Sequence, residues 1–360
     1  MQNRRISIIG TVGLPANYGG FETLVENLIR YDNSNTLKNE ITVYCSSKSY
    51  TEKKISYLTA KLKYIPFYAN GAQSIPYDIF SLFSAIWNRS DVILVLGVSG
   101  AIVLPLIRLL SSARIVTNID GIEWRRQKWK GVAKSFLRLS EKFAVRFSHE
   151  VISDNAAIAE YVKQTYGVDS HVIAYGGDHV LAAKDEDVSK YKLPDQYVFS
   201  VCRIEPENNV HMIVGAFSRQ DELALIIVGN WNNSDYGKEL REQYAYNEHI
   251  YFLEPIYDLG KLKTLRQNAS VYIHGHSAGG TNPSLVEAMH FARPVLAFDC
   301  NFNRCTTEDK ALYFTSADEL AAIITSNTDI NESVAHDMLE IAQRRYTWEI
   351  VKQQYFNLFK

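Results

Sequence analysis

The sequence predicts an α/β protein with two Rossmann-like domains that face each other across a cleft. Apolar, β-branched runs alternate with segments of helical length along the whole chain. Such near-continuous apolar strands are typical of parallel sheets that helices cover on both faces. The runs form two series, one in each half of the chain, so each half is expected to build its own sheet. Ligands of parallel sheets bind beyond the carboxyl ends of the strands, so we expect functional residues in the loops that follow strands.

The expected strands and domains follow from these runs. The first series is residues 6–9, 41–44, 62–65, 92–96, 115–119, 151–153 and 172–174, and the second is residues 197–202, 223–228, 250–253, 271–274, 295–298 and 312–314. A charged stretch, residues 184–192, separates the series, so we expect domains over residues 1–185 and 186–340. Residues 341–360 are predicted to form a helix that can pack back on the N-terminal domain, with Trp348, Val351, Tyr355 and Phe359 on one face.

Charge and cysteine usage narrow the class of protein. Residues 1–150 hold 20 lysines and arginines against 11 aspartates and glutamates, and residues 151–360 hold 18 against 29. A basic first half favours an anionic surface or ligand. The four cysteines show neither the spacing of a disulfide framework nor that of a metal site, which is typical of a reducing cytoplasm. We therefore expect a cytoplasmic protein without a bound metal or cofactor.

No targeting segment or membrane span is expected. The N-terminus runs straight into a strand, without the pattern of a signal peptide. Residues 92–110 are apolar and long enough to cross a bilayer, but Gly97, Gly100 and Pro105 interrupt them. We expect a buried strand, a glycine turn and a core helix in this region.

The loop after the first strand, residues 10–23, is the first candidate site. It contains neither Gly-x-Gly-x-x-Gly nor Gly-Lys-Ser/Thr, which excludes the usual dinucleotide fingerprint and a P-loop. The loop is long for a connection between a strand and a helix, and Gly19 and Gly20 allow close approach of the backbone to a ligand. We expect a flexible loop that binds a ligand; the alternative is a plain turn.

A second candidate site follows the fifth expected strand. Asp120 and Glu123 should face the cleft, where they either bind hydroxyl groups or cap the next helix. Residues 124–142 interleave cations with aromatic side chains. This pattern predicts a basic helix that lies on a membrane surface, or alternatively an ordinary solvated helix face.

Two loops of the second half complete the set. Arg203 follows the strand at 197–202, and its planar guanidinium could clamp a diphosphate; the alternative is a surface ion pair with Glu205 or Glu207. In residues 274–289, a small-residue loop precedes a helix that should start at Pro283 behind the N-cap Asn282. Unpaired N–H groups and the helix dipole at such a junction favour phosphate, although an ordinary strand–helix connection has the same pattern.

Three motifs together resemble those of the retaining, two-Rossmann (GT-B) glycosyltransferases of the large family that includes sucrose and mannosyl transferases. Residues 10–23, 120–126 and 275–289 match, almost throughout, the pattern of a bacterial rhamnosyltransferase-like subgroup that makes polysaccharides. The chain departs from the broader family in two places. Asn208 stands where the family has a lysine, and Gly279 stands where it has the first of two paired glutamates, of which only Glu287 remains.

The resemblance implies a metal-independent transfer, with retention of anomeric configuration, from a nucleotide-diphospho-sugar to a lipid-linked saccharide at the inner leaflet of the membrane. The donor usually implied is dTDP-L-rhamnose, and no nucleic acid is involved. Glu287 would hold the ribose, and His276 is taken to replace the missing glutamate. The expected donor-binding residues are Gly19, Gly20, Arg203, Asn208, Gly280, Thr281, Asn282 and Glu287, and the expected catalytic residues are Arg203, Asp120, Glu123 and His276.

Three other functions stay open on the sequence. The donor could be a UDP- or GDP-sugar. A sugar-nucleotide epimerase has the same architecture but needs no acceptor, so incubation with the donor alone distinguishes it. A non-catalytic nucleotide-sugar sensor is the third, because one glutamate and one lysine of the family are missing.

Overall fold

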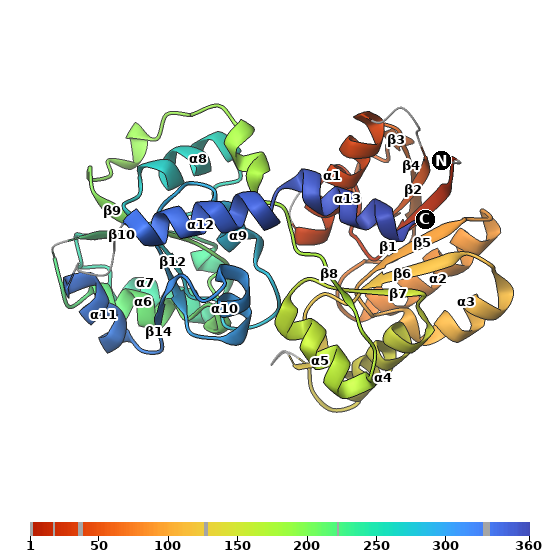
Figure 1. Cartoon of the computed structure of the whole chain (residues 1–360). Helices are drawn as coiled ribbons and strands as arrows, with labels where there is room; N and C mark the ends of the chain where they lie inside the picture. The colour runs from red at the N-terminus through yellow and green to blue at the C-terminus, as the bar shows by residue number, and fades with distance from the viewer. Residues whose placement is uncertain (1–2, 17–18, 35–38, 126–128, 222, 327–331) are drawn as a thin grey trace. The chain divides into compact units, whose positions relative to one another are not determined.

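The computed structural model describes residues 3–16, 19–34, 39–125, 129–221, 223–326 and 332–360. The chain forms two compact units, which Figure 1 shows. Unit 1 contains Met1–Ala174 and Glu349–Lys360, and unit 2 contains Tyr175–Trp348. Each unit has one mainly parallel sheet with helices on its faces. The predicted fold class, two Rossmann-like domains, is confirmed.

The sheet of unit 1 has the strand order β3-β4-β2-β1-β5-β6-β7-β8, and only the β3–β4 pair is antiparallel. The strands lie close to the expected runs, and β5 is buried along its whole length. The strands are β1 (Arg5–Ile9), β2 (Glu40–Ser46), β3 (Ser56–Tyr57), β4 (Ala60–Ile65), β5 (Val92–Leu96), β6 (Arg114–Asn118), β7 (Glu150–Ser153) and β8 (His171–Val172). The helices are α1 (Gly20–Ser34), α2 (Ser74–Trp87), α3 (Leu104–Leu110), α4 (Gly131–Phe147), α5 (Ala156–Tyr166) and α13 (Trp348–Leu358).

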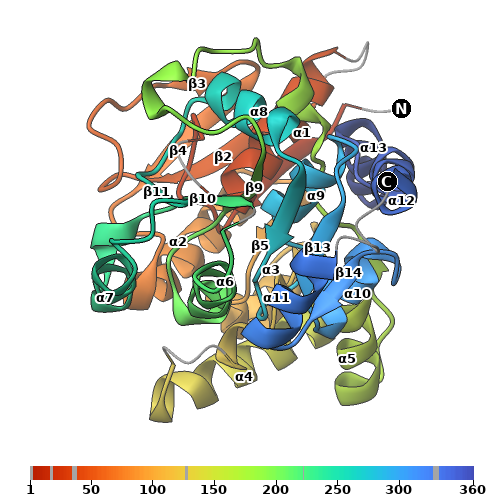
Figure 2. The same cartoon turned by 90° about the vertical axis from the view of Figure 1, so that its left-hand side faces the viewer.

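The sheet of unit 2 is parallel throughout the described residues, in the order β11-β10-β9-β12-β13-β14. Its strands are β9 (Tyr197–Val201), β10 (Ala224–Val228), β11 (Ile250–Leu253), β12 (Val271–His274), β13 (Val295–Phe298) and β14 (Leu312–Phe314). Its helices are α6 (Val210–Phe217), α7 (Asp235–Gln243), α8 (Leu259–Asn268), α9 (Pro283–Met289), α10 (Asn301–Thr307), α11 (Ala317–Ser326) and α12 (Glu332–Arg345). Side chains of α6, α7 and α11 share one hydrophobic core with the sheet, and Figure 2 shows these helices on the same side of it.

The unit boundary differs from the expected one. It lies between Ala174 and Tyr175 instead of at residues 185 and 186. The charged stretch is not a linker, because it is attached to α8 of unit 2. Lys263 Nζ donates to Ala183 O at 2.9 Å and lies 3.0 Å from the carboxylate of Asp185. These contacts hold the start of the stretch against unit 2.

The C-terminal segment contains the end of α12 and the whole of α13, where one helix over residues 341–360 was expected. The spacing of its apolar side chains was predicted correctly, because Trp348, Val351, Tyr355 and Phe359 are all buried. In unit 1, Asn118 Nδ2 donates to Tyr355 Oη at 2.7 Å.

The apolar run at residues 92–110 forms β5, a short 3₁₀ helix (Ala101–Val103) and α3. Only Leu104 and Ile107 of α3 are buried, and Leu106, Leu109 and Leu110 are exposed. The expectation of a core helix therefore holds for the buried face of α3 and is wrong for its exposed face. Within the described part of the chain, no helix combines the length and the apolar character that a membrane crossing requires.

Candidate functional site

Two loops of unit 2 form the candidate site. One follows β9 and the other follows β12, and these parallel strands are neighbours, so both loops leave the same edge of the sheet. Asn209 Nδ2 donates to Gly275 O at 2.9 Å, and the backbone N–H of Ser277 donates to Glu207 O at the same distance. A Cβ at Gly275 would lie 2.1 Å from Asn208 O. The loops therefore touch through their backbones, and only glycine fits at the contact.

Asn208 joins the predicted residues of the two loops. Its side chain is buried, and Nδ2 donates to Arg203 O at 2.9 Å. Its Oδ1 lies 2.8 Å from His276 Nδ1. With Nδ2 used as a donor, Oδ1 must accept, so His276 carries its proton on Nδ1 and its lone pair on Nε2. The structure thus brings Arg203, Asn208 and His276 together, with Asn208 as the link between the other two.

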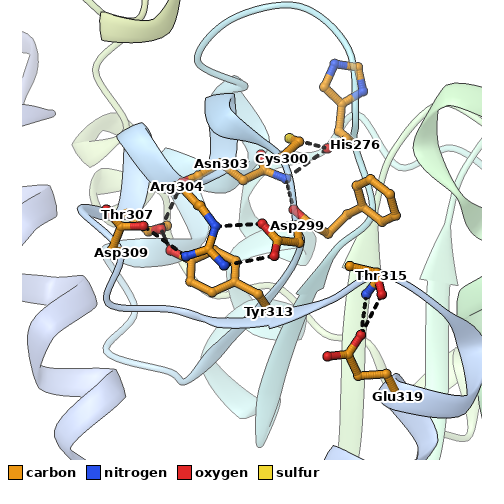
Figure 3. Close-up of polar contacts among 11 residues, drawn as sticks. His276, Asp299, Cys300, Asn303, Arg304, Thr307, Asp309, Tyr313, Thr315 and Glu319 are labelled. Carbon is orange, nitrogen blue, oxygen red and sulfur yellow. Dashed lines mark hydrogen bonds and ion pairs between the residues drawn. The ribbon is translucent and has the colours of Figure 1, made fainter.

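His276 is held by its backbone as well. Its carbonyl oxygen accepts a hydrogen bond from Asn303 Nδ2 at 2.9 Å and faces the thiol of Cys300 at 3.8 Å, as Figure 3 shows. Gly279, the position of the family's first glutamate, has a φ of 92°. A Cβ there would lie 3.5 Å from His276 Nε2. The His276 ring therefore lies beside the space where a Gly279 side chain would begin, and a side chain at this φ would be strained.

The neighbouring His274 is uncharged at neutral pH. It is buried at the end of β12, and burial, with a smaller contribution from His276, lowers the pKa of His274 well below its usual value. Its ring stacks on Tyr272 with centroids 6.2 Å apart. His274 is thus a neutral core residue beneath the site.

Arg203 lies in the loop after β9, two residues beyond the last residue of the strand, as predicted. Its Nη1 lies 3.6 Å from Glu205 Oε1, and both side chains are partly exposed. This is the surface ion pair that the sequence left as an alternative. Exposed pairs of this kind contribute little stability, so the guanidinium can exchange Glu205 for a phosphate at small cost.

The junction at the start of α9 was predicted correctly. The helix begins at Pro283, and Asn282 caps it, because Asn282 Oδ1 accepts from the backbone N–H of Ser284 at 3.0 Å. Thr281 is buried, and Gly280 lies in the loop before the cap. These three residues form the end of the β12–α9 loop.

Glu287 has partners that the sequence did not reveal. Its Oε2 accepts a short hydrogen bond from Arg266 of α8, whose side chain is 3% exposed, and its Oε1 lies 3.6 Å from His179 Nε2. Trp348 Nε1 donates to His179 Nδ1 at 2.9 Å, which leaves the His179 proton on Nε2. Burial is the main cause that lowers the pKa of His179. Glu287 is thus held by a buried arginine on one side and a neutral histidine on the other.

In unit 1, Glu22 organises the loop after β1. Its Oε1 accepts from Thr11 Oγ1 at 2.8 Å and from the backbone N–H of Val12 at 2.7 Å. A Cβ at Gly19 would lie 1.8 Å from Glu22 Oε2, and Gly20 is the first residue of α1. The Glu22 carboxylate therefore lies where a side chain at position 19 would begin, which requires glycine there. Such contacts tie residues 10–16 to the rest of unit 1, and the expected flexible, ligand-binding loop stays a prediction; residues 17–18 lie outside the described part.

Asp120 and Glu123 follow β6, as predicted. Asp120 has a φ of 59°, and its backbone N–H donates to Asn118 Oδ1 at 2.9 Å. Glu123 begins a 3₁₀ turn (Glu123–Arg125), and its Oε1 accepts from Trp129 Nε1 at 2.8 Å. Neither residue is the N-cap of α4, which is Lys130. The two carboxylates lie in the loop beyond the carboxyl end of β6.

The basic segment at residues 124–142 is not one helix. It contains the turn at Glu123–Arg125 and the start of α4 at Gly131, and Arg126 and Lys128 lie outside the described residues. The indole of Trp124 faces the cations of Arg125, Lys134 and Arg138, and its Nε1 lies 3.3 Å from Glu141 Oε1. Trp124 thus has partners within unit 1, and the expected membrane contact of this segment stays a prediction.

Sequence reasoning missed several residues that position the site. Arg266 and Asn303 gave no signal, because a polar side chain on a helix is usually exposed. His179 follows the glycine pair Gly176–Gly177, and a side chain at either glycine would overlap unit 2 neighbours, at Gly176 the ring of Trp348. This glycine pair, which follows the expected strand at residues 172–174, was the feature of the sequence that could have pointed to His179. Among the described residues, no group of three or more histidine, cysteine or acidic side chains is arranged to hold a metal ion.

Comparison with known proteins agrees with this architecture. Residues 3–178 match the family model "Domain of unknown function (DUF1972)", and residues 183–344 match "Glycosyl transferases group 1". No curated protein matches the sequence significantly.

Three solved structures illustrate the similarity of fold. Sucrose-phosphate synthase from Thermosynechococcus elongatus superposes with a TM-score of 0.82 at 15% sequence identity. The alignment covers 99% of this chain and 98% of the synthase chain. Anabaena HepE in complex with UDP has a TM-score of 0.73 at 16% identity, covering 98% of both chains. The catalytic domain of starch synthase IV from Arabidopsis thaliana, bound to ADP and acarbose, has a TM-score of 0.72 at 13% identity, covering 99% of both. The chain therefore joins a DUF1972 domain in unit 1 to a glycosyl transferases group 1 domain in unit 2, and it is a glycosyltransferase of the GT-B fold.

Proposed function

We propose that this glycosyltransferase moves L-rhamnose from dTDP-L-rhamnose onto a lipid-linked saccharide during synthesis of a bacterial surface polysaccharide, with retention of configuration. The observation that carries the proposal is the pair of loops in unit 2 that are joined to each other by hydrogen bonds. The buried amide of Asn208 joins the backbone carbonyl of Arg203 to the imidazole of His276, so a residue with a guanidinium and a residue with an imidazole are held by one side chain. A cation for a leaving diphosphate and an acceptor for sugar hydroxyls are what a transfer from a nucleotide-sugar requires.

The residues of unit 2 receive these roles in the proposal. Arg203 and the backbone near Gly280, Thr281 and Asn282 neutralise the diphosphate as the bond to the sugar breaks. His276 accepts hydrogen bonds from the sugar through Nε2 and so replaces a glutamate at Gly279, beside which its ring lies. Glu287 accepts the ribose hydroxyl. Asn208 positions Arg203 and His276 rather than contacting the donor.

The residues of unit 1 serve the acceptor side and the donor phosphates in the same proposal. Asp120 and Glu123 bind hydroxyls of the acceptor or the sugar, and the backbone at Gly19 and Gly20 approaches the phosphates. The acceptor hydroxyl attacks the anomeric carbon on the side from which the diphosphate leaves. Its proton passes to the leaving phosphate, so no protein base is required and no metal is needed.

A UDP-sugar is the second candidate donor. HepE, a structure of similar fold, is described in complex with UDP and with UDP and glucose. This structure makes a UDP-sugar the alternative to weigh, whereas the motif resemblance favours dTDP-L-rhamnose. The two donors differ at the base methyl, the ribose 2′-hydroxyl and the sugar.

A thermal-shift screen followed by a transfer assay tests the proposal. A ligand that binds only the folded state raises the unfolding midpoint, so dTDP-L-rhamnose should raise it more than UDP-glucose or GDP-mannose. Transfer is then measured with a lipid-linked or short soluble saccharide, and the anomeric configuration of the product is read by NMR. A new nucleotide-sugar formed from the donor alone would indicate an epimerase. Binding of donor without transfer to any acceptor would indicate a sensor.

A further inference from the structure

Unit 1 exposes an apolar surface on three adjacent helices, which we name the α2–α4 face. On α2 the exposed side chains are Phe80, Phe83 and Trp87, and on α3 they are Leu106, Leu109 and Leu110. Trp87 is 88% exposed and Leu109 is 81% exposed. Large apolar side chains exposed singly are ordinary, but a contiguous group of them marks an interaction surface.

The spacing of these residues places them on the outer side of the helices. On α2 they recur at intervals of three and four residues, and on α3 at three and one, so each set forms one stripe. The opposite stripes are buried, with Leu82 and Ala85 on α2 and Leu104 and Ile107 on α3. Helix α2 packs beside α3, and α3 packs beside α4, as Figure 1 also shows. The exposed stripes of neighbouring helices therefore open to the same side of unit 1.

The charge of the α2–α4 face has one sign. All residues of these three helices are described, and their two acidic side chains, Asp78 and Glu141, are buried. The remaining charged side chains are all exposed and basic: Arg108, Lys134, Arg138, Lys142 and Arg146. Helices with exposed large apolar side chains and cations, and without an exposed carboxylate of their own, complement an anionic lipid bilayer. A second copy of the same face would bring like charges together, which disfavours a symmetric dimer.

We propose that the α2–α4 face docks unit 1 onto an anionic bilayer, with Trp87 and Leu109 inserted at the level of the lipid headgroups. Tryptophan favours this interface, and the cations of α3 and α4 bind the lipid phosphates. The proposal rests on the proposed function only in that a lipid-linked acceptor requires access to a membrane surface. The proposed membrane contact thus lies on the outer side of α2 and α3 and not at Trp124, whose ring faces cations of unit 1.

Co-sedimentation with vesicles tests this surface. The full chain should pellet with vesicles of phosphatidylcholine and phosphatidylglycerol at low salt, and roughly tenfold less with phosphatidylcholine alone or at high salt, because salt screens the attraction. Trp87→Ser combined with Leu109→Ser should lower pelleting to the level of neutral vesicles. Lys142→Gln combined with Arg146→Gln should weaken pelleting and its dependence on salt. These residues are on the surface, so unfolding midpoint and donor binding should not change.

Tyr246 and Tyr257 of unit 2 provide the matched control, because they are 76% and 69% exposed. Replacement of both by serine should leave pelleting unchanged. Wild type that stays in the supernatant with anionic vesicles, or a Trp87→Ser/Leu109→Ser variant that pellets like wild type, overturns the proposal. So does a wild-type dimer in light scattering that this variant converts to a monomer, because the face would then bind a second copy. Transfer to a soluble saccharide is measured separately, so a failure of docking and a failure of the proposed function give different results.

Discussion

Replacement of Glu287 by glutamine separates two roles of one carboxylate, the proposed contact with ribose and the neutralisation of Arg266. Glutamine keeps the size of the side chain and removes its charge. Arg266 is 3% exposed, and its Nε and Nη1 have no hydrogen-bond partner among the described residues. In Glu287→Gln, a guanidinium would therefore remain buried without a counter-charge.

The expected loss of stability follows from this geometry. Removal of one partner of a buried ion pair typically costs about 3–5 kcal/mol. The glutamine oxygen can still accept the hydrogen bond from Arg266, so we expect the lower end, about 3 kcal/mol. For a domain of the size of unit 2, this corresponds to a fall in the unfolding midpoint of roughly 6–12 °C. Arg266→Met should cost less, because water can reach the remaining carboxylate of Glu287, which is 17% exposed. The double variant should be more stable than the sum of the two losses predicts, by about 2 kcal/mol.

Scanning calorimetry measures the midpoints, and titration calorimetry at a temperature well below them measures nucleotide affinity. Glu287→Gln and the double variant should both bind dTDP about 10–100-fold more weakly, since each lacks the charged acceptor for ribose. Glu254→Gln is the control, because Glu254 forms an exposed ion pair with Arg241 in the same unit, and its loss should cost under about 1 kcal/mol. Equal midpoints for Glu287→Gln and wild type would refute the buried-pair argument. Unchanged nucleotide affinity would refute the ribose contact.

Three further predictions concern other groups. Arg203→Ala should lower turnover in the transfer assay by about a hundredfold or more, and Arg203→Lys should restore only part of the lost activity. EDTA should leave the wild-type rate unchanged. Full activity of the alanine variant would contradict the diphosphate role. His276→Ala should lower kcat about a hundredfold. Asn208→Ala should lower kcat less, and circular dichroism should show an intact fold. An Asn208→Ala variant with wild-type kcat would show that the link to His276 is dispensable. Burial raises the pKa of Asp78 to about 8, so the folded state keeps a proton that the unfolded state releases above about pH 4. Stability should therefore fall between about pH 4 and pH 8. Asp78→Asn should raise the midpoint at about pH 8 and have little effect at about pH 4, and a pH-independent difference between the two proteins would contradict this.

Local patterns in the sequence were sufficient to predict the elements of this fold. Every expected strand is present, because strands buried on both faces require short, continuous apolar runs. The start of α9 at Pro283 was predicted for a similar reason, since an N-cap residue followed by proline satisfies the first turn locally. The positions of Arg203 and His276 at strand ends followed from the direction of parallel strands.

Contacts between distant residues could not be predicted in this way. The unit boundary at Ala174 and Tyr175 depends on hydrogen bonds between the stretch after Ala182 and α8. The two faces of α3 differ because the rest of unit 1 covers Leu104 and Ile107 but leaves Leu109 exposed. In each case the deciding partner is far away in sequence, so no window of neighbouring residues contains the information.

The sequence by itself thus determined two parallel α/β sheets and the strand ends at which the candidate residues lie, because hydrophobic period and capping are properties of neighbouring residues. Only the tertiary structure decided what those residues touch. It joined Asn208 to Arg203 and His276, placed Arg266 and His179 against Glu287, and put the Glu22 carboxylate over Gly19. Burial and pairing of polar groups depend on which segments the fold brings together, and that is a property of the whole packed chain.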